Sequence, residues 1–323
     1  MKMVMVSAVK TGVASLKVGE VSMEKVRRER KKEKVVVIMG ATGTGKSKLA
    51  IELATQFRQA EIVNSDKMQV YEGLEITTNK VRKEECRGVR HHLLGTVDPK
   101  ANFTANDFCK QATVAVESIL KREALPIIAG GSNSFLEALV NHYPDFSMRY
   151  TCCFLWLHVS LPVLHSSLSA RVDRMIRSGL LHEVQQIFQY HNRDYSLGIR
   201  RAIGVPEFHD FFSSLSDNAH HSTTHSLLHS AISSLKLNNC NLATKQLLHI
   251  LRLYSLWQPN MHLLDATEVF RHSSSPHLAH LSWHHHVFSK STSILHNFFY
   301  DYDDSLLPSV IASPPPPIAS ATR

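Results

Sequence analysis

The chain has 323 residues, of which 43% are hydrophobic and 20% charged. This composition is typical of a globular protein of one or two domains, and it argues against a disordered chain. No apolar run approaches the ~18 residues that a membrane-spanning helix needs, so we expect no membrane partner. The net charge is +8, but residues 1–34 carry ten Lys/Arg against four Glu and account for +6 of it. Five cysteines without C-x-x-C spacing argue against a cysteine zinc site and a disulfide framework.

Residues 1–33 form a basic segment that lacks the long apolar stretch of a secretory signal. Two interpretations remain open, a plastid or mitochondrial transit peptide and a basic tail that precedes the first strand. Glu20, Glu24, Glu29 and Glu33 argue against a transit peptide, because such peptides contain few acidic residues.

The first predicted strand is the apolar run Val35–Met39, which is typical of a buried parallel strand. The glycine-rich segment after it fits G-x-x-x-x-G-K-[ST]. In that motif backbone N–H groups bind a chain of phosphates, the Lys contacts the terminal phosphates and the final hydroxyl contacts Mg²⁺. Residues 49–57 then place apolar side chains at helical spacing. Because strand, glycine turn and helix come in this order, we predict a phosphate-binding P-loop. It consists of Gly40, Ala41, Thr42, Gly43, Thr44, Gly45, Lys46 and Ser47.

Two further predicted strands end in polar residues or glycine. Glu61–Asn64 leads to Asp66, and ligands of open α/β sheets bind at the carboxyl ends of the strands. The residues alone leave Asp66 as either a helix cap or a group that accepts a proton or helps to hold Mg²⁺. Pro126–Ala129 leads to a glycine pair, then Ser132 and Asn133. That pair indicates either a tight turn or a close approach of backbone to a ligand.

The second half of the chain is predicted to be mainly helical. Apolar spacing indicates a helix over about residues 227–257, whereas the Ser/His-rich stretch 213–230 reads as a loop. Arg200 and Arg201 lie between glycines, as in a loop that binds an anion, although solvated surface arginines fit equally. We therefore predict an α/β fold, with a P-loop NTPase-like parallel sheet flanked by helices and a smaller, mainly helical domain. The predicted segments are the basic tail or transit peptide 1–33, the P-loop α/β core 34–160, the helical substrate-binding portion 161–270 that returns to the core, and a disordered tail 271–323.

Six segments together resemble plant adenylate isopentenyltransferases, within the wider isopentenyltransferase family that includes tRNA dimethylallyltransferases. The resemblance covers about residues 34–270 and is densest up to Glu207. The segments are Met39–Ser47, Asn64–Tyr71, His91–Gly95, Ile128–Ser134, Gly198–Glu207 and Asp265–Phe270.

The resemblance implies that the P-loop serves prenyl transfer. Dimethylallyl diphosphate would place its diphosphate in the loop with Mg²⁺ on Ser47, and the N6 amine of ATP, ADP or AMP would attack the allylic carbon. Asp66 would accept the N6 proton and Arg201 would bind the diphosphate. The resemblance also implies a plastid enzyme of cytokinin biosynthesis, with the cytoplasm as the alternative, and we expect a monomer. Residues implied to contact the nucleotide are Ser132 and Asn133, with Lys236, Lys245 and Arg252 for its outer phosphates.

Three alternatives accompany this interpretation. A tRNA dimethylallyltransferase performs the same chemistry, but residues 35–211 are nearly neutral and the chain has no Cys-x-x-Cys…His pattern, so tRNA is not the expected acceptor. A generic P-loop kinase or NTPase is the second alternative. It is not favoured, because apart from Asp66 the sequence shows no convincing strand that ends in a carboxylate. An inactive relative that only binds nucleotide is suggested by Ser233, Ser234, Leu237 and His249, which stand where relatives have a helix rich in Lys and Arg.

Overall fold

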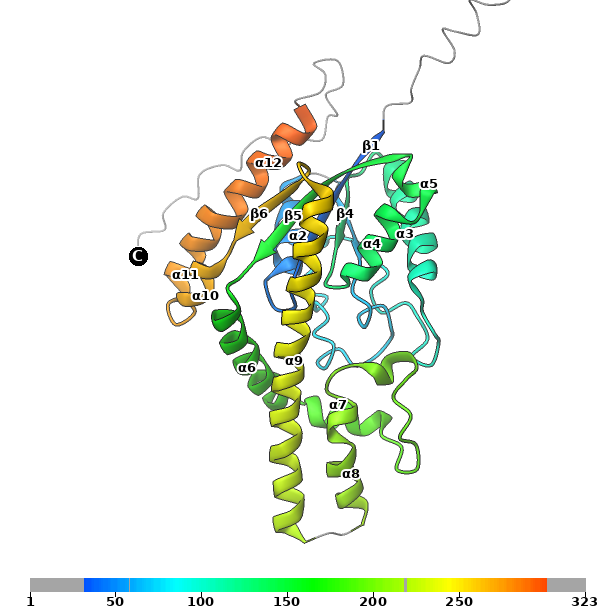
Figure 1. The fold of residues 1–323 in the computed structure, drawn as a ribbon, viewed down its shortest axis with the longest axis vertical. Helices are drawn as coiled ribbons and strands as arrows, with labels where there is room; N and C mark the ends of the chain where they lie inside the picture. Colours follow the sequence, from blue (N-terminus) through cyan, green and yellow to red (C-terminus); the bar gives the residue numbers. More distant parts are fainter. Residues whose placement is uncertain (1–31, 58, 218–219, 301–323) are drawn as a thin grey trace, which may run out of the picture.

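A computed structural model of the chain describes residues 32–57, 59–217 and 220–300. Six parallel strands form one sheet in the order β3-β2-β4-β1-β5-β6, which confirms the predicted parallel sheet (Figure 1). The central strand is the one that precedes the P-loop, and its neighbours on either side are β4 and β5. The strands are β1 (Glu33–Gly40), β2 (Glu61–Asn64), β3 (His91–His92), β4 (Pro126–Ala129), β5 (Tyr150–His158) and β6 (Met261–Asp265).

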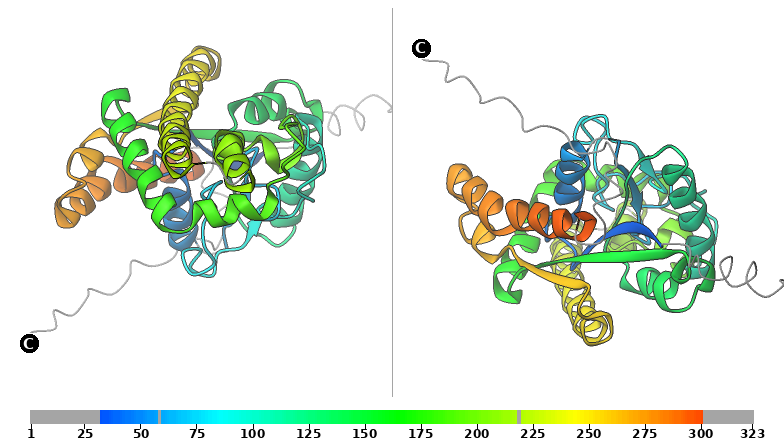
Figure 2. Two further views of the ribbon diagram at one scale, coloured as in Figure 1. Left: turned by 90° about the horizontal axis from the view of Figure 1, so that it is seen from below. Right: turned by 90° about the horizontal axis from the view of Figure 1, so that it is seen from above.

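Helices connect the strands and cover both faces of the sheet (Figure 2). The helix after the P-loop begins at Lys46, as its apolar spacing predicted. The helix after Thr104 begins with a complete capping box, in which the Thr104 and Asp107 side chains each bond the other's backbone N–H. The helices are α2 (Lys46–Gln56), α3 (Ala105–Leu120), α4 (Asn133–Asn141), α5 (Pro144–Ser147), α6 (Leu161–Arg177), α7 (Leu180–Ile187), α8 (His209–Ser216), α9 (His221–Trp257), α10 (Thr267–Arg271), α11 (Pro276–Trp283) and α12 (Ser289–Tyr300). Two 3-10 turns (η1, Gly198–Arg201; η2, Pro206–Phe208) and a π-helical turn (η3, His284–Phe288) complete them.

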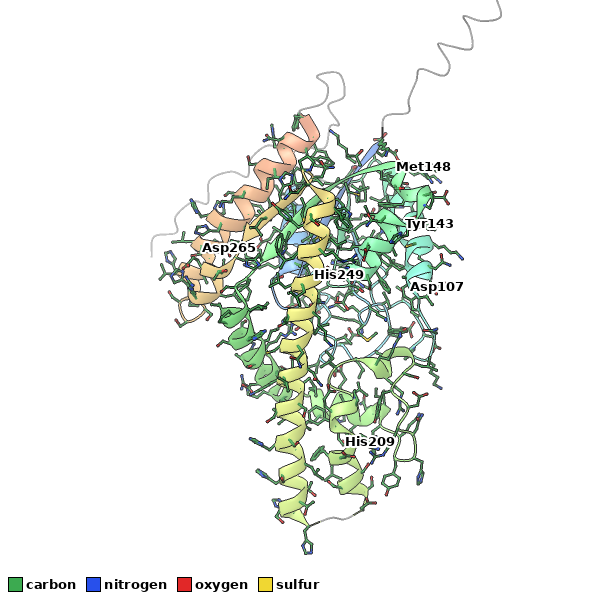
Figure 3. All side chains as sticks on the ribbon, viewed as in Figure 1. Asp107, Tyr143, Met148, His209, His249 and Asp265 are labelled. Atoms are coloured by element: carbon green, nitrogen blue, oxygen red, sulfur yellow. The ribbon has the colours of Figure 1, made fainter. Side chains whose placement is uncertain are left out.

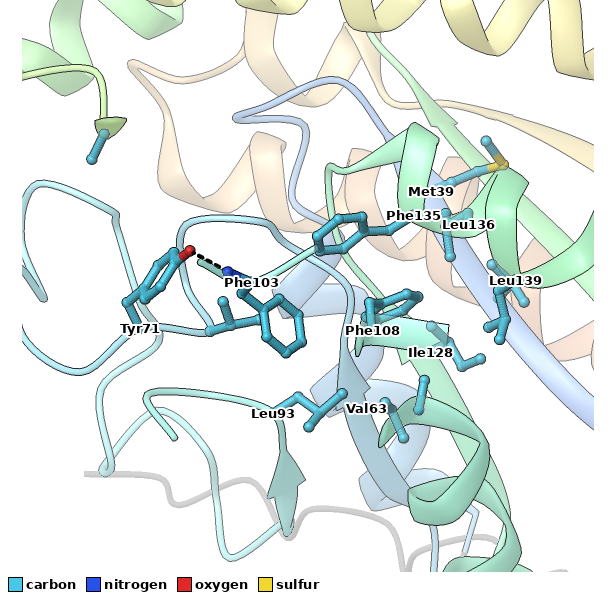
Figure 4. Close-up of a cluster of buried hydrophobic side chains, with 14 of the residues drawn as sticks. Met39, Val63, Tyr71, Leu93, Phe103, Phe108, Ile128, Phe135, Leu136 and Leu139 are labelled. Atoms are coloured by element: carbon cyan, nitrogen blue, oxygen red, sulfur yellow. Dashed lines mark hydrogen bonds between the residues drawn. The ribbon is translucent and has the colours of Figure 1, made fainter. Parts of the chain in front are cut away.

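Two apolar cores lie on opposite faces of the sheet. Alternate residues of β1 supply them, because successive side chains of a strand point to opposite faces. Val35, Val37 and Met39 enter the core beneath α3 and α4, and Figure 4 shows part of that core with Phe108 and Phe135 stacked at 4.8 Å between ring centroids. Val36 and Ile38 enter the core beneath α2. A strand buried on both faces explains the continuous apolar run of β1.

The smaller helical part is built around α9, a helix of 37 residues that extends well beyond the sheet beside α7 and α8 (Figure 1). The chain then returns to the edge of the sheet as β6. The predicted loop over 213–230 is wrong for residues 213–216 and 221–230, which belong to α8 and the start of α9. That stretch contains no Gly or Pro, and Ser and His only mildly disfavour helix, so the packing of Phe212 and Leu228 decides the outcome.

The predicted disordered tail is wrong for residues 271–300, because Arg271 ends α10 and residues 276–300 form α11, η3 and α12. Trp283, Val287, Ser291 and Leu295 are all buried and recur every four residues, which is the spacing of one helix face. That face packs on the core beneath α2 and on β5 and β6. We call residues 276–300 the C-terminal arm. Residues 1–31 and 301–323, with the proline run at 314–317, lie outside the described residues.

Within the described ranges, none of the helices has the length and apolarity of a bilayer-spanning segment.

Candidate active site

The P-loop curls between the end of β1 and the start of α2. Gly43 and Gly45 have φ values of 81° and 97°, a backbone region that side chains with a Cβ rarely adopt. The Thr44 hydroxyl donates to the Ala41 carbonyl at 3.0 Å, which closes the loop on itself. The loop therefore presents its backbone and the first turn of α2 to the space at the carboxyl end of the sheet, as the motif predicted.

Lys46 is almost fully buried at the first position of α2. Its Nζ donates to the Ala41 carbonyl at 2.7 Å, so the side chain folds back over the loop. Burial lowers the pKa of Lys46 to about 8, an effect that nearby Asp66 opposes and Arg171 reinforces. Among the described residues, the one hydrogen-bond partner of this buried ammonium is that carbonyl, so the ammonium is poised to bind a phosphate oxygen.

A cavity of about 650 Å³ lies over the loop. Its wall comes from the ends of three adjacent strands, β2, β4 and β1, and from α6, the Arg201 turn and α9. Of the residues expected at the site, those that line the cavity are Thr42, Gly43, Gly45, Lys46, Ser47, Asp66, Ser132, Asn133, Arg201 and Lys245.

Asp66 emerges from the end of β2 and lines this cavity. Its Oδ1 accepts hydrogen bonds from the backbone N–H groups of Met68 at 2.9 Å and Gln69 at 3.3 Å. Its Oδ2 points toward Gly131, where an added Cβ would lie 3.3 Å from Oδ2 and 3.8 Å from Lys46 Nζ. One oxygen thus fixes the carboxylate as a turn-capping Asp does, and the other faces the cavity. The hydrogen bonds to Oδ1 are those of a capping Asp, and the position of Oδ2 is compatible with a further role at the cavity.

Arg201 reaches the cavity from η1. Its Nη2 donates to the Tyr71 hydroxyl at 2.8 Å and its Nε to the Gly198 carbonyl at 3.2 Å. The phenol of Tyr71 is fully buried and also accepts from the Phe103 backbone N–H at 3.2 Å, as Figure 4 shows. Arg201 is therefore held in place by a buried partner, whereas Arg200 bonds Gln189 at 2.9 Å on the surface.

One of the three basic residues that were expected to contact the nucleotide from α9 lies at the cavity, and two do not. Lys245 lines the cavity, but Lys236 and Arg252 do not. Lys236 lies nine residues earlier, about half a turn around the helix, and pairs with Asp173 of α6 at 2.7 Å. Arg252 lies two turns further on and binds Glu137 of α4 at 2.7 Å. Both expected phosphate contacts are corrected to ion pairs between helices. His249, which Figure 3 labels on α9, also pairs with Glu137 and lines the cavity.

Two residues of the site escaped the sequence prediction. Arg171 of α6 lines the cavity, with its Nη2 on Asn239 of α9 at 2.9 Å and on the Thr42 hydroxyl at 3.3 Å. The Nε of Arg171 is buried with no protein partner among the described residues. Burial also lowers the pKa of Arg171 to about 10. The sequence did contain a signal for Arg171, because this charged residue lies on the same face of α6 as the buried Leu168 and Met175.

Gln246 is the second, and it joins α9 to two loops. Its Oε1 accepts from the Thr42 backbone N–H at 2.7 Å, and its Nε2 donates to the Gly131 carbonyl at 2.7 Å. Its own carbonyl accepts from Asn133 Nδ2 at 3.1 Å. A long-range polar contact of this kind has no signature in local sequence.

Comparisons with known proteins show the family to which the chain belongs. The family model described as IPP transferase matches residues 69–149 and 142–252. Adenylate isopentenyltransferase 5, chloroplastic, of Arabidopsis thaliana is 54% identical over 300 residues, covering 90% of each chain. Adenylate isopentenyltransferase 7, mitochondrial, of the same plant is 53% identical over 74% of this chain and 72% of its own.

Among solved structures, a eukaryotic dimethylallyltransferase acting on tRNA superposes with a TM-score of 0.68 at 24% identity, over 85% of this chain and 81% of its own. That likeness concerns the fold. The family model matches more than half of this chain, and a relative is more than 50% identical to the chain over nearly its whole length. This protein therefore belongs to the IPP transferase family.

Proposed function

We propose that the protein transfers the dimethylallyl group of dimethylallyl diphosphate to N6 of the adenine of ATP, ADP or AMP. The observation that carries the proposal is the convergence of Lys46, Asp66 and Arg201 on one cavity, in a chain that is 54% identical to an adenylate isopentenyltransferase. The products are isopentenyladenine nucleotides, which belong to cytokinin biosynthesis.

The reaction displaces pyrophosphate, so the site must stabilise negative charge on a leaving group. The N6 lone pair forms a bond to the allylic C1 as the bond from C1 to the diphosphate oxygen breaks. Lys46 and Arg201 bind the diphosphate, and the buried Nε of Arg171 gives it a further donor. Preorganised cationic donors in a partly enclosed cavity are an effective way to stabilise such charge.

Asp66 positions the adenine amine and takes its proton. An aryl amine is a weak nucleophile, and a hydrogen bond to a carboxylate orients its lone pair. The free Oδ2 is available for this role, because the backbone N–H groups of Met68 and Gln69 occupy Oδ1. Asp66 and Lys46 both border Gly131, so the acceptor amine and the leaving group meet at that glycine.

Magnesium fits the residues present only as a substrate-bound ion. Within the described residues, no three His, Cys, Asp or Glu side chains gather into a metal site. Ser47 offers one hydroxyl at the cavity, which suits Mg²⁺, because this ion is often held by substrate phosphates and water with few protein ligands. When bound, it would offset the charge of the departing pyrophosphate.

The nucleotide would lie on the α4 and α9 side of the cavity. Ser132 and Asn133 line that wall, and the Oδ1 of Asn133 is buried with no protein partner in the described chain, which leaves an acceptor for a nucleotide donor. Lys245 is the basic residue of α9 available to the outer phosphates. Since Lys236 and Arg252 bind other helices, the preference among ATP, ADP and AMP rests on Lys245 and the neighbouring His249.

We propose a plastid enzyme that acts as a monomer on free nucleotides. One similar relative carries a chloroplastic name and another a mitochondrial name. The basic segment 1–33 fits either organelle, and residues 1–31 lie outside the described structure.

The test is a set of separate reactions that contain the purified protein, Mg²⁺, dimethylallyl diphosphate and one acceptor. The acceptors are ATP, ADP, AMP and unmodified tRNA, and the products are digested and analysed for N6-dimethylallyl adenine by mass spectrometry. We expect product with the mononucleotides and none with the Lys46→Ala variant. Product on tRNA alone would favour the tRNA enzyme, and no product with any acceptor would favour an inactive nucleotide-binding relative.

A further inference from the structure

The C-terminal arm, residues 276–300, contacts the P-loop from behind through a single buried tryptophan. Trp283 ends α11 and is only 4% exposed. Its ring packs against Gly45, where an added Cβ would lie 3.0 Å from the ring. Gly45 is the residue that leads the P-loop into α2, and its φ of 97° depends on the absence of a side chain. The tryptophan ring therefore restricts the backbone at Gly45, where the P-loop joins α2.

The same ring also contacts the first turn and the second turn of α2. The ammonium of Lys48 lies 4.1 Å from the centre of the indole, close enough for a cation–π interaction. The indole N–H donates to Glu52 Oε2 at 2.6 Å, and Lys48 is 4.0 Å from Oε1 of the same carboxylate. Lys48 follows Ser47 and lines the cavity, so the tryptophan contacts a residue of the cavity wall.

We infer that Trp283 is a positioning residue of the diphosphate site, which acts through Gly45 and Lys48 and makes the C-terminal arm part of the prenyl-donor machinery. Trp283 itself does not line the cavity, so it does not touch the substrate. The inference rests on the proposed binding of diphosphate by the P-loop.

Trp257 provides a matched control within the same chain. It is also a buried tryptophan, 7% exposed, and its indole N–H also has a side-chain acceptor, Asn141 Oδ1 at 2.9 Å. It stacks on Phe154 at 4.5 Å between ring centroids and does not line the cavity. Replacing either tryptophan by leucine removes a large buried side chain, but only Trp283 contacts the P-loop.

The experiment measures the affinity of inorganic pyrophosphate, with Mg²⁺, for the full chain by titration calorimetry. Wild type, Trp283→Leu, Trp283→Phe and Trp257→Leu are compared at a temperature at which circular dichroism shows all of them folded. We expect Trp283→Leu to bind pyrophosphate roughly tenfold more weakly and Trp283→Phe to recover most of that loss, because phenylalanine keeps a ring for Gly45 and Lys48. Trp257→Leu should bind like wild type.

Steady-state kinetics give a second readout. Trp283→Leu should raise KM for dimethylallyl diphosphate and leave KM for the nucleotide unchanged, whereas general loosening of the fold would change both. In a Lys48→Met background, Trp283→Leu should raise KM for dimethylallyl diphosphate by a smaller factor, because the contact between the tryptophan and Lys48 has already been removed. Unchanged pyrophosphate affinity in Trp283→Leu, or an equal loss in Trp257→Leu, overturns the inference while leaving the proposed function intact. Failure of the wild-type protein to bind pyrophosphate overturns both.

Discussion

Replacing Gln246 by leucine tests whether α9 fastens the two loops of the site. The substitution preserves approximate size but removes the acceptor for the Thr42 N–H and the donor for the Gly131 carbonyl, both at 2.7 Å. Each hydrogen bond of this kind contributes about 0.5–1.5 kcal/mol net, so the variant should lose about 1–3 kcal/mol of stability. In a fold of this size 1 kcal/mol corresponds to about 2–4 °C in Tm, and we expect a fall of several degrees.

The loosened P-loop should also raise KM for dimethylallyl diphosphate. Thermal unfolding followed by circular dichroism gives the Tm, and initial rates at saturating nucleotide give the KM. Asn241→Ala is the control, since Asn241 is an exposed residue of the same helix. A Gln246→Leu variant with the Tm and KM of wild type would refute the idea that α9 holds the loops.

Substitutions at Asp66, Lys46 and Arg171 test individual roles. Asp66→Asn should lower turnover by about 10²–10⁴-fold, the usual contribution of a general base, while pyrophosphate affinity measured by calorimetry stays within a few-fold; turnover like wild type would exclude the role. Burial lowers the pKa of Lys46 to about 8, so pyrophosphate affinity should weaken as pH rises from 7 to 9, and Lys46→Arg, which stays charged, should lack that weakening. The unfolded chain keeps this lysine proton up to about its usual pKa of 10.5 and binds more protons than the folded chain between the two values. Lys46 should therefore make stability rise with pH across that window, and a urea-unfolding series at pH 8 to 10 should lack the rise in Lys46→Met. Arg171→Leu should raise KM for dimethylallyl diphosphate at least tenfold, whereas Arg174→Leu on the exposed side of α6 should not; equal effects would show that α6 acts only through its general charge.

The parts of the site that were predictable from sequence are those in which the chemistry is local. Gly40–Ser47 is contiguous, and its glycines, lysine and hydroxyl all belong to one loop, so the pattern predicts the geometry of that loop. Asp66 was placed correctly because it follows a strand, and the carboxyl ends of parallel strands share one edge of the sheet.

The parts that sequence reasoning missed depend on contacts between distant segments. Lys236, Lys245 and Arg252 look alike in the sequence, and only the rotation of α9 and the acidic residues of neighbouring helices decide which of them faces the cavity. Arg171 could have been noticed as a charge on an apolar helix face, but its target, the P-loop, lies more than 120 residues away.

The C-terminal arm was missed for a different reason. The proline run at 314–317 suggested a disordered end to the chain, although Trp283, Val287 and Leu295 mark a buried helix face ahead of it. Composition outweighed periodicity in that prediction, and the buried face shows that periodicity was the better guide.

The proposed function requires this cavity to prenylate free adenine nucleotides. The most direct test is one reaction in which ADP and unmodified tRNA compete, at equal adenine-acceptor concentration, for deuterium-labelled dimethylallyl diphosphate. Mass spectrometry then quantifies the label in the mononucleotide and in the digested tRNA. We predict that the label enters ADP in large excess and that Asp66→Asn removes it; label found mainly in tRNA, or in neither acceptor, would contradict the assignment.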